Sequence, residues 1–312
     1  MIILLFACSK PPLVGEQKKR QKDASEEISL ANCGGCHVEE MTEWRDSRHA
    51  QSWTNPIFQA SFSVTSFPSW CQDCHQPILE KSLDTQFRDA GVGCLTCHWQ
   101  EGEIRTSNPN TKMKSAPHKL RYDAQFGRSE FCAECHQFEL PQYHPMHSDT
   151  PVQNTYQEWV ESGSEKQCQN CHMKEYGHSF PGGHNQDFMK ESIEVLVSRE
   201  NEYLHVSLKS INVGHALPTG DPFRRLQWRL CGDKSCSHIL VRKSFAIIHQ
   251  GPSWHVEKDN RLHPKQEKHF SIPSPNTDTW WSLGYFFGDP YLEKHLTEED
   301  IWMEISKGFI SK

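Results

Sequence analysis

The chain has 312 residues, a formal net charge of −7 at pH 7 with histidine counted as neutral, and a hydrophobic fraction of 36%. The negative charge argues against nucleic acid as a partner, because binding to a phosphate backbone needs an excess of Lys and Arg. The hydrophobic fraction is low for a globular protein, whereas an aromatic content of 11% argues against disorder. We therefore expect a bound apolar group to fill part of the core.

The N-terminal segment, residues 1–30, has the character of a lipoprotein signal followed by a solvated tether. A short apolar run ends in Ala7, and the small residue before Cys8 is typical of signals that are cleaved before a cysteine that then carries a lipid. The run is too short to span a membrane. The alternative is an ordinary signal segment that happens to end in a cysteine. We expect a periplasmic protein that is anchored to a membrane through a lipid on Cys8.

Five Cys-x-x-Cys-His motifs follow, and they use most of the 13 cysteines of the chain. Their cysteines are Cys33, Cys36, Cys71, Cys74, Cys94, Cys97, Cys132, Cys135, Cys168 and Cys171, and their histidines are His37, His75, His98, His136 and His172. In such a motif two thiols attach to the vinyl groups of haem c, and the histidine becomes the proximal iron ligand. A single copy also fits half a zinc site or a redox dithiol. A closed zinc site normally combines two Cys-x-x-Cys pairs, so five pairs would leave one pair over. A histidine also follows all five pairs, which zinc binding does not require. We therefore expect five covalently attached haem c groups.

Function depends on the sixth coordination position of each iron. A second histidine there makes an electron carrier, whereas an open position can bind a small molecule. Five histidines outside the motifs have a local context that favours a distal ligand: His49, His118, His178, His184 and His215. His144 and His147 are held in reserve, and the other seven histidines, from His205 onward, are not expected to bind iron.

Each of these five candidates has its own reason. His49 lies in an expected helix after the first motif, and His118 follows a proline in an expected loop. His178 and His184 flank a stretch with two glycines, which let the backbone approach a planar group closely. His215 lies in a Gly- and Pro-containing loop expected between two strands. A contact with a haem propionate or the surface is the alternative for His118 and His184.

The region of the motifs, residues 31–185, is expected to be one mainly helical haem domain. In residues 154–164 the apolar residues Tyr156, Trp159 and Val160 have helical spacing and predict a short amphipathic helix before the fifth motif. Residues 108–117 are expected to form a loop. Because little chain separates the motifs, the haems must pack on one another.

The pattern changes near residue 186. Apolar residues alternate along residues 193–197, 204–208 and 226–230, which predicts an antiparallel, sandwich-like β-domain over residues 186–312. The alternation returns at residues 301–305, although the acidic stretch from Thr297 is also a plausible helix start. The fold class is therefore α+β. Cys231 and Cys236 flank a short turn and are expected to form a disulfide rather than two unpaired thiols.

The first motif is followed by a Trp-x-x-Ser-x-His pattern at Trp44, Ser47 and His49. With this pattern the chain resembles the multihaem cytochromes related to the tetrahaem electron acceptor of hydroxylamine oxidoreductase, in which the histidine of the pattern is a distal ligand. Residues 151–173, the stretch HSFPGGH and the loop GHALPTGDPFRRL resemble a subgroup with a C-terminal β-domain. The resemblance implies a closely stacked haem array that handles electrons in the periplasm. The fifth motif and the β-domain depart from the tetrahaem pattern, so its ligand scheme does not transfer haem by haem.

The main alternative is a reductase of nitrogen or sulfur oxyanions that acts at one five-coordinate haem. Pentahaem nitrite reductases carry Lys in place of one motif histidine, and none of the five motifs does so here. Hydroxylamine oxidoreductases carry more haems and a cross-linked tyrosine, and nothing singles out Tyr143, Tyr156 or Tyr176 for that role. A sensor or scaffold subunit is a third class. We favour an electron carrier between periplasmic or membrane redox proteins, with no catalytic residue assigned.

Overall fold

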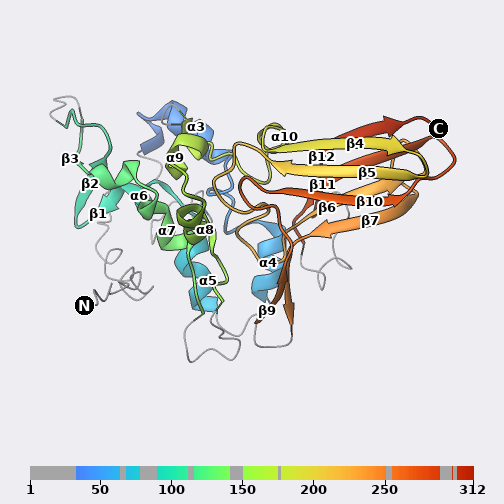
Figure 1. Ribbon diagram of the computed structural model, residues 1–312. Coiled ribbons are helices and arrows are strands. Elements are labelled where there is room, and N and C mark those ends of the chain that lie inside the picture. Colours follow the sequence, from blue (N-terminus) through green and yellow to red (C-terminus); the bar gives the residue numbers. More distant parts are fainter. Residues whose placement is uncertain are drawn as a thin grey trace, which may run out of the picture.

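A computed structural model describes residues 33–63, 68–77, 90–111, 116–140, 150–174, 177–250, 255–288, 297 and 301–312. The predictions for Cys8, Tyr143, His144, His147 and Tyr176 lie outside the described residues. The chain is α+β, as predicted. Figure 1 shows the helices in blue to green at one end and the long strands in yellow to red at the other.

Short helices carry most of the motifs. The described helices are α3 (Val38–Arg45), α4 (Pro56–Ser63), α5 (Pro68–His75), α6 (Cys94–His98), α7 (Glu130–His136), α8 (Thr155–Ser162), α9 (Cys168–His172) and α10 (Gln186–Lys190), with a 3-10 turn η3 (Ala124–Gly127). Helices α5, α6, α7 and α9 each end at the histidine of a motif, and the first motif leads into α3 with His37 as its N-cap. The helical turn suits the motif because residues three apart lie on one face, so that both thiols point the same way.

A small sheet follows the third motif directly. It contains β1 (Trp99–Gln100), β2 (Glu103–Thr106) and β3 (Leu120–Tyr122). Strand β2 lies in the middle, antiparallel to β1 and parallel to β3. His118 lies in the bend just before β3, as the loop prediction required. Sequence patterns did not predict this sheet, because its strands have two to four residues and intermediate or mixed burial.

The C-terminal part consists of two antiparallel sheets and a hairpin. The strands are β4 (Ile193–Glu200), β5 (Tyr203–Ser210), β6 (Arg225–Cys231), β7 (Ile239–Phe245), β8 (Ile247–Gln250), β9 (His255–Asp259), β10 (Glu267–Pro273), β11 (Thr279–Phe286) and β12 (Trp302–Ile310). Their order is β10-β5-β4 in one sheet and β12-β11-β6-β7 in the other, and β8 pairs with β9. Side chains from both sheets form one core cluster that includes Leu204, Leu208, Leu226, Trp228 and Leu283. The three alternating runs are thus β4, β5 and β6, and residues 302–310 form a strand.

Two local expectations are wrong. His49 lies in a turn beyond the end of α3 rather than inside a helix. Helix α8 forms as predicted and ends at Gly163, which adopts the left-handed conformation that glycine allows. Its exposed face differs from the expectation, because Val160 is 47% exposed whereas Glu158 is buried. Glu158 is buried because it pairs with Arg261 of the β-domain.

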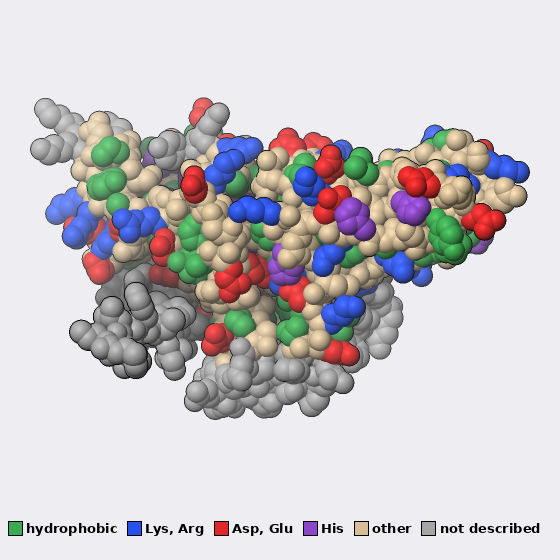
Figure 2. Space-filling model, viewed as in Figure 1, with side chains coloured by type: hydrophobic (Ala, Val, Ile, Leu, Met, Phe, Trp, Pro, Cys, Tyr) green, Lys and Arg blue, Asp and Glu red, His purple; other side chains and the backbone are tan. Residues whose placement is uncertain are grey.

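The visible face of the molecule carries acidic and basic side chains side by side (Figure 2). This mixture fits the modest net charge of the chain. None of the helices in the described part of the chain is both long and apolar enough to cross a membrane.

Candidate functional site

Three motif histidines each face one histidine from outside the motifs at nearly the same separation. The pairs and the distances between their ring centroids are His49–His136 at 6.3 Å, His98–His178 at 6.3 Å and His172–His215 at 6.2 Å. A histidine nitrogen lies about 2 Å from a transition-metal ion, and the ring centroid lies about 1 Å behind it. Two imidazoles that bind one iron from opposite sides therefore have centroids about 6 Å apart. The three pairs have this spacing, so the residues fit haem iron.

The hydrogen bonds of four histidines leave the correct ring nitrogen for an iron. The bonds run from Nδ1 to a backbone carbonyl: His75 to Ser52 at 3.0 Å, His98 to Arg105 at 2.7 Å, His172 to Pro181 at 2.6 Å and His215 to Ala216 at 2.8 Å. A carbonyl only accepts, so Nδ1 carries the proton and Nε2 keeps a free lone pair. Such a bond fixes both the tautomer and the orientation of a ligating imidazole.

Burial keeps the imidazoles of the His49–His136 pair neutral. It is the largest cause that lowers the pKa of His136 to about 3 and the pKa of His49 to about 4, with a further contribution from neighbouring histidines. A neutral imidazole is the form that binds iron.

The cysteines show which motifs are neighbours in space. Thiols of different motifs form hydrogen bonds in three pairs, which are Cys33 with Cys94, Cys74 with Cys135, and Cys132 with Cys168. The first motif therefore lies beside the third, the second beside the fourth, and the fourth beside the fifth. Cys97 also acts electrostatically on two thiols of the fourth motif, so the third and fourth motifs are close. The spatial order of the motifs differs from their order along the chain.

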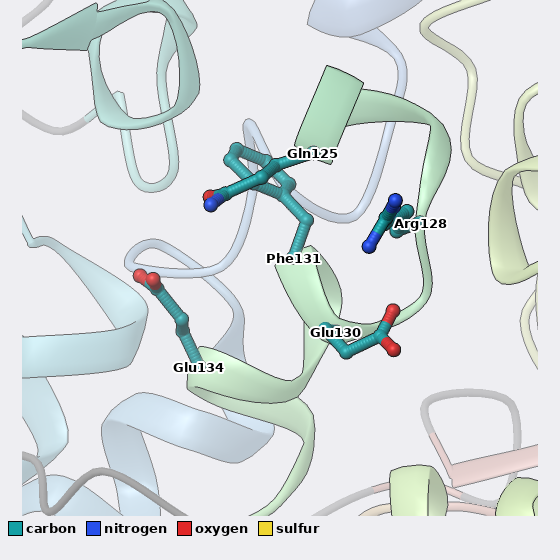
Figure 3. Close-up of a pocket in the computed structure, with 5 residues that line it drawn as sticks. All are labelled: Gln125, Arg128, Glu130, Phe131 and Glu134. Carbon is teal, nitrogen blue, oxygen red and sulfur yellow. The ribbon is translucent and has the colours of Figure 1, made fainter. Parts of the chain in front are cut away.

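A pocket lies beside the fourth motif, between it and the third. Its lining residues are Gln125, Arg128, Glu130, Phe131 and Glu134, which Figure 3 shows as sticks; Glu130, Phe131 and Glu134 belong to α7. The ring of Phe131 stacks on Phe126, which in turn stacks on His98. Phe131 is the aromatic residue of the pocket lining, and the ring of Phe126 separates it from His98.

Within the part of the chain that the structure describes, no second imidazole lies about 6 Å from the ring of His37, His75 or His118. His37 and His118 both act electrostatically on His98, so His118 lies near the first and third motifs. Its Nδ1 is buried and has no hydrogen-bond partner. His75 instead stacks on Phe58, with the ring centroids 3.8 Å apart and the planes 8° from parallel.

His184 is placed differently from the paired histidines. Its Nδ1 lies 2.9 Å from Nη2 of Arg48, and its ring stacks on Phe287 with the centroids 3.7 Å apart. Because Arg only donates, Nδ1 of His184 accepts and its proton lies on Nε2. A neutral imidazole in this tautomer has no lone pair left for an iron. The axial role of His184 stays a prediction, and this contact favours another role.

Glu158 is a residue that sequence patterns missed. Its Oε1 forms an ion pair with Nη1 of Arg261 at 2.7 Å, and both side chains are buried. Its Oε2 accepts hydrogen bonds from the Thr219 hydroxyl at 2.7 Å and from the Ala216 backbone at 3.2 Å. The carboxylate therefore fastens the loop that carries His215 to α8, and α8 leads into the fifth motif. Nothing in the spacing of α8 distinguishes this glutamate from a surface residue.

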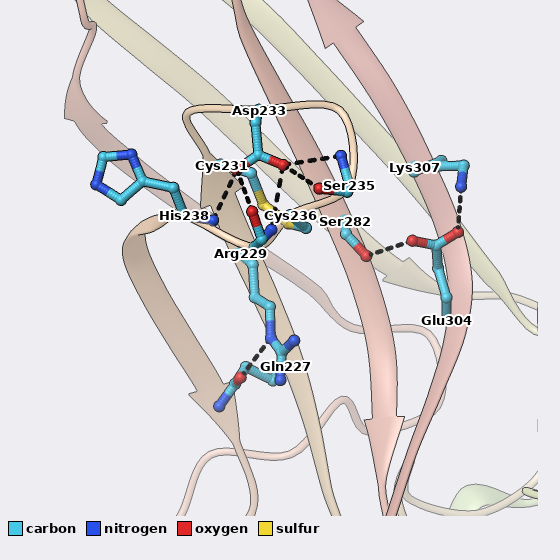
Figure 4. The surroundings of a disulfide bond; sticks show 11 residues. Gln227, Arg229, Cys231, Asp233, Ser235, Cys236, His238, Ser282, Glu304 and Lys307 are labelled. Atoms are coloured by element: carbon cyan, nitrogen blue, oxygen red, sulfur yellow. Dashed lines mark hydrogen bonds and ion pairs between the residues drawn. A yellow bond between two sulfur atoms is a disulfide. The ribbon is translucent and has the colours of Figure 1, made fainter. Parts of the chain in front are cut away.

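Cys231 and Cys236 form the predicted disulfide, with their Cα atoms 5.0 Å apart (Figure 4). The turn between them is organised by Asp233, which accepts hydrogen bonds from the backbone of Ser235, Ser237 and His238. These bonds, led by that from the Ser235 hydroxyl, hold the pKa of Asp233 below its usual value.

No curated protein matches the chain. Residues 32–99, which contain the first three motifs, match the family described as cytochrome c554 and c-prime. The structure is similar to the crystal structure of a penta-heme cytochrome c552 from Thermochromatium tepidum, with a TM-score of 0.74 and 22% sequence identity over 92% of this chain and 99% of that chain. At this identity the similarity shows a shared fold. Neither comparison shows the resemblance to the electron acceptor of hydroxylamine oxidoreductase, and together they support a multihaem c-type cytochrome.

Proposed function

We propose that the chain is an electron carrier that holds five covalently attached haem c groups and passes electrons between periplasmic or membrane redox proteins. The main support for this proposal is that three pairs of imidazoles have the spacing expected for two ligands of one haem iron. Bound haem supplies a reversible one-electron change at its iron. The paired imidazoles would hold such an iron from both sides and exclude other ligands, which favours simple electron transfer.

The contacts between motifs support conduction through the array. Since thiols of neighbouring motifs touch, groups attached to them are held within close contact of one another. The position of His118 near the first motif supports it as the distal partner of His37. The first, third, fourth and fifth motifs would then all have two imidazoles.

The location outside the cytoplasm and the lipid on Cys8 are part of the same proposal. The disulfide between Cys231 and Cys236 supports an oxidising compartment. Intact-mass measurement of the protein isolated from membranes tests the lipid, because a Cys8→Ser variant would lose both the lipid mass and the membrane fraction. A wild-type chain without that mass would contradict the anchor.

The test of the carrier combines haem counting with spin state. We expect a pyridine haemochrome assay and intact mass to give five haems per chain, and electron paramagnetic resonance of the oxidised protein to show mainly low-spin iron. Fewer than five haems would refute the count. A mainly high-spin protein would refute the carrier.

A reductase of a small molecule at one open haem is the second candidate. The observation that favours it is His75, which faces Phe58 and no imidazole at axial spacing in the described part of the chain. Carbon monoxide titration of the reduced protein decides between the two. One molecule bound per chain would support the reductase, and no binding would remove it.

A further inference from the structure

Four side chains from distant parts of the sequence meet outside the imidazole pairs. Arg48 follows α3, His184 precedes α10, Arg224 precedes β6, and Tyr285 lies on β11. Arg48 donates to His184 at 2.9 Å, and Arg224 forms a hydrogen bond with the Tyr285 hydroxyl. A Cβ added to Gly183 would lie 3.1 Å from Cζ and 3.3 Å from the hydroxyl of Tyr285, so the backbone next to His184 touches the phenol. The two bonded pairs are therefore adjacent.

This cluster has more positive than negative charge. Arg48 bonds only to neutral groups, Gln51 at 3.3 Å and His184, and no carboxylate in the described part of the chain lies within ion-pair distance of it. Arg224 has the Tyr285 hydroxyl and the Thr219 carbonyl as hydrogen-bond partners, and the Asp221 carboxylate acts electrostatically on both Arg224 and Tyr285. Two guanidinium groups against one carboxylate leave an excess of positive charge. Partial desolvation of the Arg48 guanidinium, followed by repulsion from Arg224, lowers the pKa of Arg48. Arg48 is exposed and Arg224 is half-buried, so an anion beside the two groups would offset their excess positive charge.

The four side chains of the cluster have unused N–H and O–H groups that can donate hydrogen bonds. Arg48 and Arg224 have N–H groups that are not used by these contacts, and guanidinium groups cannot accept. His184 carries its proton on Nε2, as its bond from Arg48 requires, and Tyr285 has a hydroxyl proton to donate. A small oxyanion, which only accepts, matches this set of donors.

The cluster lies next to the second and fourth motifs. Arg224 acts electrostatically on both His75 and His136, and Asp221 acts on His75. His75 is also the motif histidine that stacks on Phe58 instead of facing an imidazole.

We infer that Arg48, His184, Arg224 and Tyr285 form a binding site for one oxyanion group beside the second motif. The group is either the carboxylate of a haem propionate or a free oxyanion such as nitrite, since both present the same acceptor oxygens. The site goes beyond the electron-carrier proposal and does not depend on it.

The test uses the oxidised holoprotein, sodium nitrite as the free anion, and three variants. Arg224→Gln and Arg48→Gln each remove one positive charge, and Tyr285→Phe keeps the ring but removes the hydroxyl. Arg121→Gln is the matched control, because Arg121 is exposed and pairs with Glu103 on the small sheet. Isothermal titration calorimetry measures nitrite binding, and spectroelectrochemistry measures the haem potentials.

If the anion is free, the wild type binds one nitrite per chain, the three site variants bind it about tenfold more weakly or worse, and the control binds it normally. If the anion is a propionate, the wild type does not bind nitrite, and the uncharged change Tyr285→Phe lowers the potential of one haem as the arginine variants do, because the carboxylate loses a hydrogen-bond donor. Both outcomes support the site and separate the two sources. Site variants that match Arg121→Gln in both measurements would overturn it. Should Arg224→Gln fail to fold, Arg48→Gln and Tyr285→Phe still decide the question.

Discussion

Replacing Glu158 with Gln tests whether the β-domain holds its axial histidine in place through α8. The substitution keeps the size of the side chain and one acceptor oxygen but removes the charge. It therefore breaks the ion pair with Arg261 while it leaves an acceptor for the Thr219 hydroxyl or the Ala216 amide. The expected results are a loss of stability and a looser loop around His215.

The size of the effect follows from burial. The side chains of Glu158 and Arg261 are 6% and 7% exposed, so a lone guanidinium there is poorly solvated. Removing one partner of a buried ion pair costs about 3–5 kcal/mol. Arg261 keeps Asp259 at 2.7 Å as a second partner, so we expect the low end, about 3 kcal/mol. That is a large part of the free energy of unfolding of a typical protein, which is about 5–15 kcal/mol.

Glu161→Gln is the matched control, because Glu161 lies exposed on the same helix and contacts only Gln157 at 3.0 Å. An exposed contact of this kind contributes about 0–1 kcal/mol. Denaturant unfolding followed by circular dichroism measures stability, and electron paramagnetic resonance measures the high-spin fraction. If Glu158→Gln matches Glu161→Gln in stability and keeps all of its low-spin iron, the reasoning about this anchor is refuted.

Three further predictions use other parts of the molecule. His215→Ala should convert one haem to high spin in the absorption spectrum, whereas His269→Ala, at an exposed position on β10, should not; equal spectra would remove His215 as a ligand. Cys236→Ser should lower the free energy of unfolding by about 2 kcal/mol, as expected for a loop this short, and an unchanged denaturation midpoint would contradict it. Burial alone raises the pKa of Asp259, but the hydrogen bonds and charge of Arg261 outweigh burial and hold that pKa below its usual value. Its stabilising contribution is therefore present above about pH 4, the unfolded value, and is lost as the pH falls through the folded pKa. In Asp259→Asn the free energy of unfolding should therefore fall less steeply at acid pH than in the wild type. An equally steep fall would argue against a stabilising Asp259–Arg261 contact.

Sequence patterns predicted the parts of the fold that repeat at short range. Alternating apolar residues located β4, β5 and β6, because each of these strands places its alternating apolar side chains in a shared core. Strand β6 is also buried at the polar positions between them. The spacing of the cysteines marked the five motifs, and the structure adds that four of them lie on short helices. The domain boundaries near residues 31, 186 and 312 stay predictions.

The parts that sequence patterns missed depend on contacts between distant residues. Glu158 is polar at a position that helical spacing marks as exposed, and only Arg261, about a hundred residues later, explains its burial. In the same way, His184 looks like any histidine near glycines until Arg48 is placed beside its Nδ1. Of the five distal candidates, three lie at axial spacing, and the pairing among them follows from the three-dimensional fold alone.

The close approach of thiols from different motifs has a consequence for how the protein matures. Cys33 and Cys94 are 61 residues apart in the sequence with the second motif between them, yet their thiols form a hydrogen bond. In an oxidising compartment, bare thiols at such a distance would cross-link readily and trap a chain without its cofactors. Haem attachment must therefore outpace folding, or a reductant must hold the thiols open until each site is filled.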